Sequence, residues 1–241
     1  MAQFTMMVCP HDTVHEPERW HRLKQYLAKV IGETVHLSLS LDFPDFQEHL
    51  HEAAIVYANP GDTLKLVDGQ GYIAVAHPTN LFDEAVFVAS ESSDTSSLAV
   101  LNGATITTVT NLIASKVAVR SLRKQGITPG GFEHTDSWLS VVGCLWRGEC
   151  QYGIVYRDTY EGLSEQGKGM VKLIGNTDEH VAFHSLLISP ALADKQAALT
   201  EALLAMSNEP AGKAILDELK IAAWAPVTSE QLATMGAVMA E

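Results

Sequence analysis

Residues 54–67 read AIVYANPGDTLKLV, a short apolar run followed at once by a helix signal. Residues 54–57 have the length and composition of a buried strand. Asn59 is a preferred helix cap, and Pro60 suits the first helical position. The stretch therefore predicts a βα unit, the building block of a parallel sheet.

The same alternation of strands and helices continues along most of the chain. Strands are predicted at 4–9, 35–41, 54–57, 72–76, 85–89, 105–109, 152–156, 170–174 and 181–188. Helices are predicted at 17–31, 46–50, 60–67, 111–124, 137–146, 158–165, 194–206 and 212–219, with a last one near the C-terminus. Breaks at 77–83 and 175–179 interrupt the series. We expect two lobes, with residues 1–84 and 182–241 in lobe one and residues 85–181 in lobe two.

Composition indicates a globular protein. Of the 241 residues, 46% are hydrophobic and 19% are charged, so the chain can bury a real core. No apolar run is long enough to cross a bilayer. The first residues show no basic start, long apolar region or cleavage site. They predict either a cytoplasmic protein or one whose leader is not part of this sequence.

The net charge argues against some partners. It is −13, from 29 acids against 16 bases, and no stretch of sequence gathers Lys and Arg into a patch. Nucleic acid and anionic membrane are poor fits to such a chain. An anionic ligand still fits, because helix N-termini and hydroxyl groups can hold an oxyanion without a cation.

The cysteines and histidines do not form a recognisable metal motif. Three cysteines are an odd number and lack zinc-type spacing, so we expect no structural disulfide and no cofactor. The spacing of His11, His15 and His21 does not place all three on one helical face. We therefore expect no metal site. No nucleophile elbow, P-loop or dinucleotide fingerprint is present, so no catalytic residue is assigned and no enzyme activity is expected.

Four segments carry a resemblance to a known family. They are Val8-Cys9-Pro10 with the helix at 20–27, the strand-to-helix loop at 55–60, the loop and helix at 98–126, and residues 137–153 with Arg147-Gly148-Glu149. In this order they resemble the phosphate, phosphite and phosphonate family of ABC-transporter substrate-binding proteins. The resemblance implies the type 2 periplasmic-binding-protein fold, an α/β fold of two lobes. Each lobe is a mostly parallel sheet flanked by helices, and two crossings join the lobes.

The chain departs from the family pattern where the ligand would bind. Residues 108–111 read Thr-Val-Thr-Asn where the family usually has a Ser-Thr-Ser-Gly type of loop, and Trp138 follows Ser137 where the family tends to have histidine. A tryptophan offers one N–H donor and an apolar wall, and it cannot become cationic. We therefore expect a ligand that is less charged than phosphate or partly apolar.

Ligands of open α/β sheets lie outside the carboxyl ends of strands, where helices begin. The loops at 10–16, 58–62, 108–111 and 135–138 fit that description. The predicted ligand-binding residues are His11, Thr13, Tyr57, Asn59, Thr108, Thr110, Ser137 and Trp138. Asn59, Thr110 and Ser137 could equally be ordinary helix caps, and Trp138 could pack in a lobe core.

The resemblance implies a solute-binding protein that holds a small phosphonate-, phosphite- or phosphate-like oxyanion in a cleft between lobes. Closure of a hinge on the ligand would present the closed form to an ABC-transporter permease or a signalling partner. It implies a periplasmic location. Two alternatives stay open: an enzyme on the same fold acting on a small anionic metabolite, and a stand-alone effector-sensing regulatory domain.

Overall fold

The computed structural model describes residues 3–13, 16–40 and 42–241. The prediction made for His15, and the end of the strand predicted at 35–41, fall outside these ranges. The chain divides into two compact units, residues 1–81 with 183–233 and residues 82–182 with 234–241. Residues 234–241, expected in lobe one, thus belong to the second unit. No helix in the described ranges combines the length and apolar character needed to cross a membrane.

The first unit is built on a six-stranded sheet in the order β11-β4-β10-β3-β1-β2. Its strands are β1 (Gln3–Val8), β2 (Thr34–Leu39), β3 (Ile55–Ala58), β4 (Ile73–Pro78), β10 (Ser185–Ile188) and β11 (Trp224–Pro226). β1 is parallel to β2 and β3, whereas β10 is antiparallel to β3 and β4. The start of β10 therefore lies at the same edge of the sheet as the ends of β1 and β3.

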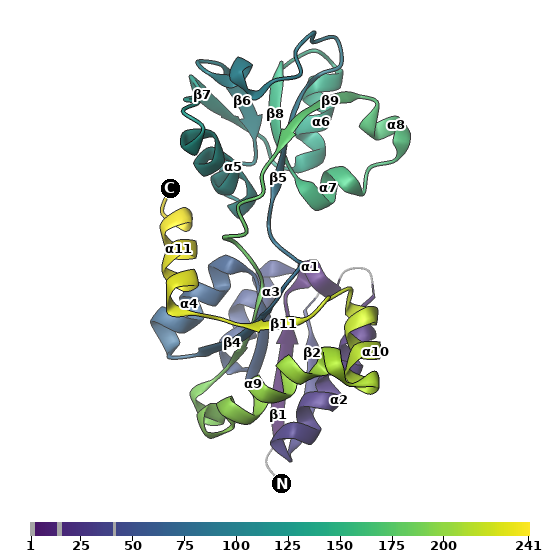
Figure 1. The fold of residues 1–241 in the computed structure, drawn as a ribbon, viewed down its shortest axis with the longest axis vertical. Helices are drawn as coiled ribbons and strands as arrows, with labels where there is room; N and C mark the ends of the chain where they lie inside the picture. Colours follow the sequence, from purple (N-terminus) through teal and green to yellow (C-terminus); the bar gives the residue numbers. More distant parts are fainter. Residues whose placement is uncertain (1–2, 14–15, 41) are drawn as a thin grey trace. The chain divides into compact units, whose positions relative to one another are not determined.

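Helices cover both faces of this sheet (Figure 1). They are α1 (Pro10–Thr13), α2 (Arg19–Ile31), α3 (Phe43–His49), α4 (Pro60–Gln70), α9 (Gln196–Ala205) and α10 (Pro210–Leu219), with 3-10 turns η1 (Leu50–Glu52), η3 (Pro190–Lys195) and η4 (Met206–Asn208). Alternate residues of β1 and β3 face opposite cores: Met6 and Ile55 join α2, α9 and α10, while Met7 and Val56 join α3 and α4. The apolar strands 4–9 and 54–57 are thus buried on both faces, as strands between two helix layers must be.

The second unit has a five-stranded sheet in the order β7-β6-β8-β5-β9. Its strands are β5 (Ala85–Ser90), β6 (Thr105–Thr108), β7 (Gly131–His134), β8 (Tyr152–Tyr156) and β9 (Val171–Asn176). β6 is parallel to β7 and β8, and β5 is antiparallel to β8 and β9. In both sheets most strands share one direction, as predicted, and each sheet is mixed because β5 in one, and β10 and β11 in the other, run in the opposite direction.

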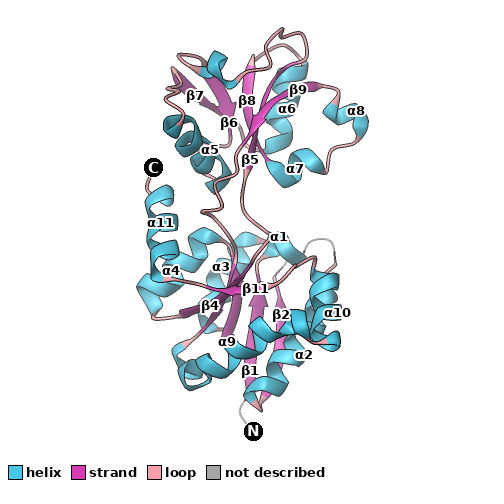
Figure 2. Ribbon diagram, in the orientation of Figure 1, coloured by secondary structure: helices cyan, strands magenta, loops and turns pink. Residues whose placement is uncertain are grey.

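The helices of the second unit again form two layers (Figure 2). They are η2 (Leu98–Leu101), α5 (Ile113–Lys124), α6 (Trp138–Trp146), α7 (Arg157–Glu161) and α8 (Glu165–Lys168), and α11 (Ser229–Met239) spans the boundary between units. Phe87 and Ile154 face the α5 side of the sheet, and Val86 and Val155 face the α6 side. The N-termini of α5 and α6 follow directly from the segments after β6 and β7.

A disulfide joins Cys144 to Cys150 around the end of α6, with the two Cα atoms 5.6 Å apart. The expectation of no structural disulfide is therefore wrong. An odd cysteine count excludes only the pairing of all three, and Cys9 is the cysteine left over. Within the closed loop, the Arg147 guanidinium donates two hydrogen bonds to the Glu149 carboxylate, at 2.8 and 2.7 Å.

His77, on β4, gives the first unit a pH-dependent stability. Burial lowers its pKa below the ordinary value of 6.5, and the neutral ring stacks on Phe183 with centroids 4.1 Å apart. Below pH 6.5 the unfolded chain binds a proton at this residue more readily than the folded chain does. The stabilisation is therefore present above this pH and lost as the pH falls.

We expect the free energy of unfolding to fall more steeply from about pH 7 to pH 5 in the wild type than in a His77→Gln variant. Urea denaturation across this range measures the difference. His36→Gln, at an exposed position on β2, is the matched control and should follow the wild type. Parallel pH curves for the wild type and His77→Gln would contradict the prediction.

Candidate functional site

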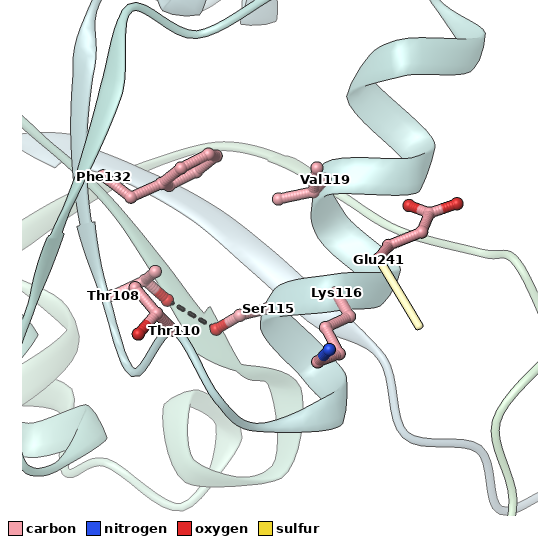
Figure 3. A pocket seen from close by; sticks show the side chains of 7 residues that line it. All are labelled: Thr108, Thr110, Ser115, Lys116, Val119, Phe132 and Glu241. Carbon is pink, nitrogen blue, oxygen red and sulfur yellow. Dashed lines mark hydrogen bonds between the residues drawn. The ribbon is translucent and has the colours of Figure 1, made fainter. Parts of the chain in front are cut away.

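A pocket in the second unit lies where β6 leads into α5 (Figure 3). Its volume is about 200 Å³, and its lining combines hydroxyl, cationic, acidic and apolar groups: Thr108, Thr110, Ser115, Lys116, Val119, Phe132 and Glu241. The size suits a small solute of a few heavy atoms. Two predicted site residues, Thr108 and Thr110, are among the lining residues.

The buried hydroxyl groups of Thr108 and Ser115 hold the loop between β6 and α5 in place through hydrogen bonds. Thr108 Oγ1 lies 2.7 Å from Ser115 Oγ and 3.1 Å from the carbonyl oxygen of Ile154. The Ser115 hydroxyl donates to the carbonyl of Val109 at 2.8 Å. The Thr108 side chain is 1% exposed, so these bonds serve the connection between β6 and α5. Of the two threonine hydroxyl groups in the lining, that of Thr110 lies nearer the surface.

Thr110 has a histidine beside it that the sequence did not point to. Its Oγ1 lies 3.1 Å from His134 Nδ1, and its backbone N–H donates to the same nitrogen at 3.4 Å. His134 is the last residue of β7, which is paired with β6. Because a hydroxyl rotates about its C–O bond, Thr110 can direct its hydrogen to His134 or to a ligand in the pocket.

Lys116 supplies a positive charge that sequence reasoning also missed. Its Nζ donates to the carbonyl oxygen of Met239 at 2.6 Å, at the end of α11. Arg120 and Arg123 follow on α5, and their guanidinium groups lie 3.7 and 3.2 Å from Glu241 Oε1. The three cations recur at helical spacing. The chain thus does gather basic residues, although the overall balance is acidic.

The N-terminus of α5 adds to the positive charge that Lys116 brings to the pocket. Its N-cap is Leu112, and no side chain among the described residues caps it. Uncapped N–H groups and the positive end of the helix dipole favour an anion there. Lys116 lies in the first turn of the same helix, and the Glu241 carboxylate on the pocket wall is paired with Arg120 and Arg123, so the pocket is suited to a negatively charged group.

Ser137 and Trp138 open the other helix of the second unit. The Ser137 hydroxyl accepts a hydrogen bond from the Ser140 N–H at 3.1 Å, and the serine is therefore an N-cap. Trp138 is partly buried and packs against the cores on both sides of the sheet. Neither residue lines the pocket at Thr110. Their predicted ligand contact stays a prediction.

The four site residues predicted in the first unit gather near the ends of β1 and β3. Tyr57 is 1% exposed, and its ring packs on Trp20 with centroids 4.7 Å apart. Asn59 caps α4 by accepting the Asp62 N–H at 3.0 Å. The Thr13 hydroxyl donates to the Pro10 carbonyl at 3.3 Å, whereas His11 is exposed. Thr13 and Asn59 therefore have local structural roles.

One group of side chains in the first unit could hold a metal ion. The ligand atoms of Cys9, Asp12 and His184 all lie within 4.8 Å of one another. Burial first, and then the nearby Asp12 carboxylate, raise the pKa of the Cys9 thiol to about 12. The sequence-based expectation of no metal rested on the spacing of the cysteines and of the histidines near the N-terminus, and His184 lies far from them in the chain.

Asp83 and Glu84 mark the start of the second unit and are both buried. The Tyr156 hydroxyl lies 3.0 Å from Asp83 Oδ1 and 3.1 Å from Asp158 Oδ2. Burial and these two carboxylates raise the pKa of Tyr156 far above its ordinary value, so the phenol remains a neutral donor. Asp83 is therefore a hydrogen-bonded residue of the interior.

Three solved structures of similar fold are distant from this chain in sequence. PhnD1 of Prochlorococcus marinus in complex with methylphosphonate has a TM-score of 0.69 at 15% identity, over 98% of this chain and 96% of its own. The sulphonate-binding protein SsuA of Escherichia coli has a TM-score of 0.69 at 13% identity, over 100% of this chain and 91% of its own. A binding component of a phosphonate ABC transporter from Pseudomonas aeruginosa has a TM-score of 0.65 at 12% identity, over 98% of this chain and 85% of its own. No curated protein sequence matches significantly.

These likenesses define the class: the chain has the two-lobed α/β fold of type 2 periplasmic binding proteins. The family model for the periplasmic substrate-binding proteins of phosphonate ABC transporters matches residues 6–232. The chain belongs to that family, and the resemblance seen in the sequence is confirmed. The family and the similar structures are substrate-binding proteins, which implies a small-molecule ligand and a transporter permease as partner.

Proposed function

We propose that the pocket of the second unit binds a small oxyanion that carries a short apolar substituent, such as an alkylphosphonate. The observation that carries this proposal is the combination of Thr110, Lys116 and the start of α5 with an apolar wall of Val119 and Phe132. A hydroxyl, an ammonium group and a helix N-terminus favour the charged head, and the wall favours a methyl or ethyl group over another oxygen.

The apolar contact was expected from Trp138, because that residue replaces a histidine of the family pattern. Phe132 is a better source, since it lines the pocket itself. We therefore keep the prediction of a partly apolar ligand and attribute the apolar contact to Phe132 in place of Trp138. A protein of this family similar to this chain, PhnD1, is known in complex with methylphosphonate, which agrees with that ligand class.

We propose binding without turnover. The family consists of substrate-binding proteins, and the pocket hydroxyls of Thr108 and Ser115 are engaged in fixed hydrogen bonds. An unchanged ligand after prolonged incubation, followed by phosphorus NMR, is the expected result. Release of a product would instead favour the enzyme alternative. That one ligand engages both units and closes a hinge stays a prediction, which compaction on ligand addition in solution scattering would support.

Replacing Thr110 with Ala should weaken binding by about 1–3 kcal/mol, because the variant loses a donor to a charged acceptor. Ser137→Ala is predicted to have an effect of the same size if Ser137 also donates to the ligand. Calorimetry with methylphosphonate measures both. Thr105→Ala, at the exposed start of β6, is the matched control and should bind like the wild type. Unchanged affinity in Thr110→Ala would exclude Thr110 from the site.

A further inference from the structure

The first unit brings three side chains of different chemistry to one point. Cys9 directly follows β1, Asp12 lies in α1, and His184 directly precedes β10. Because β10 runs antiparallel to β3, its beginning lies at the edge where β1 and β3 end. The sheet topology therefore gathers a thiol, a carboxylate and an imidazole that lie far apart in the sequence.

The distances are close to those of a coordination site. All three ligand atoms lie within 4.8 Å of one another, and His184 Nδ1 is 2.8 Å from Asp12 Oδ2. Bonds of about 2.0–2.1 Å from zinc to nitrogen and oxygen would place those two atoms about 3.3 Å apart. A small outward shift of Asp12 and His184 is enough to admit the ion. Their side chains are 17% and 11% exposed, so an ion can reach them.

A second set of contacts supports the three ligands. The Asn59 amide points its Nδ2 at Cys9 Sγ, at 3.8 Å, and Asp62 holds that amide through a 2.7 Å hydrogen bond. An N–H donor directed at the sulfur is what stabilises a thiolate ligand. Arg19 and the Trp20 indole both donate to the Asp12 carbonyl, at 2.9 and 3.2 Å, which fixes the backbone of α1.

We propose that Cys9, Asp12 and His184 form a binding site for a single zinc ion. Sulfur, nitrogen and oxygen donors together suit borderline metals such as zinc, and three protein ligands leave the fourth tetrahedral position open. A thiolate and a carboxylate cancel the charge of the ion, so the buried site is neutral when filled. The site consists of residues of the first unit alone, and the proposal does not depend on which ligand the pocket at Thr110 binds.

Cobalt and zinc loading test this site directly. Metal-stripped wild-type protein should take up one Zn²⁺ per chain by metal analysis, and one Co²⁺ with a thiolate-to-cobalt charge-transfer band in the near ultraviolet. Cys9→Ser should abolish the band, and Asp12→Asn should weaken zinc binding at least about tenfold. Asn59→Ala, which removes the donor to sulfur together with the cap of α4, should weaken zinc binding by about tenfold.

Two controls separate this site from other metal ligands. The double variant Cys144→Ser/Cys150→Ser removes the other cysteines, and His36→Ala removes an exposed histidine; both should bind zinc like the wild type. Absence of the charge-transfer band in the wild type would overturn the proposal. So would equal zinc affinity in the wild type, Asp12→Asn and Asn59→Ala, a comparison that holds even if Cys9→Ser fails to fold. Calorimetry of methylphosphonate with the metal-stripped protein tests the oxyanion proposal separately.

Discussion

Replacing Lys116 with Met will lower the affinity for an alkylphosphonate by about 100-fold, or roughly 2–3 kcal/mol. The ammonium group lies in the first turn of α5 and lines the pocket. It is half-buried, so solvent screens its attraction for an anion less than at an exposed site. Methionine keeps the length and most of the apolar stem while removing the charge. Calorimetry on both proteins gives the change in dissociation constant.

Lys124→Met is the matched control for this prediction. Lys124 is in the last turn of the same helix, pairs with Glu179 and does not line the pocket. We expect its affinity to stay within about twofold of the wild type, since Lys124 does not line the pocket and solvent screens its exposed charge. Equal losses in the two lysine variants would mean that only the general charge of α5 matters. Unchanged binding in Lys116→Met would place the ligand elsewhere.

Replacing Glu84 with Ala will destabilise the second unit by about 3–5 kcal/mol, since each donor left unsatisfied in the interior costs about 1–3 kcal/mol. The carboxylate is 1% exposed. Its Oε1 accepts the backbone N–H groups of Glu179 and His180 at 2.8 and 2.7 Å, and its Oε2 accepts the Thr177 hydroxyl. One side chain thus ties the segment after β9 to the start of β5.

Calorimetric melting measures this effect, and we expect the transition to fall by roughly 10 °C or more. Glu84→Gln should lie between the wild type and Glu84→Ala, because the amide keeps an acceptor but turns a donor toward another donor. Glu133→Ala, at an exposed position of β7, is the matched control and should melt like the wild type. A melting temperature of Glu84→Ala close to that of Glu133→Ala would contradict the role of Glu84.

The fold could be predicted from local signals that agree with one another. The strand at 54–57 and the cap at Asn59 are found as β3 and the start of α4, because burial on both faces leaves a continuous apolar run. β7 was missed, since Glu133 and His134 are exposed and the strand has no apolar alternation. The reversed direction of β5 and β10 was also beyond local signals, because it depends on where the chain re-enters a sheet.

The candidate site was accessible from sequence only in part. Thr110 stands at the pocket because loops after parallel strands lie at one edge of the sheet. Lys116 was missed because the acidic total hides a local group, although its helical spacing with Arg120 and Arg123 was visible in the sequence. Glu241 and His184 could not be assigned, since only tertiary structure brings distant segments to α5 and to β1.

Trp138 follows the N-cap of α6, and from the sequence we also expected it to supply the apolar wall of the ligand site. A side chain next to a helix cap can face either a ligand or the core, and sequence alone does not say which. Trp138 packs against the cores on both sides of the sheet, whereas Phe132, on the overlooked strand β7, lines the pocket. One error in the fold, the missed strand β7, and one in the site, the missed Phe132, therefore have the same source, an edge strand without a hydrophobic pattern.

Titration calorimetry of the wild type and a Thr110→Ala/Lys116→Met variant with methylphosphonate, phosphate and sulfate tests the central claim most directly. We predict saturable binding of methylphosphonate to the wild type with one site per chain, weaker binding of phosphate and sulfate, and loss of measurable binding in the variant. Wild-type protein that binds none of the three anions, or a folded variant that binds methylphosphonate as tightly as the wild type, would contradict an oxyanion site at this pocket.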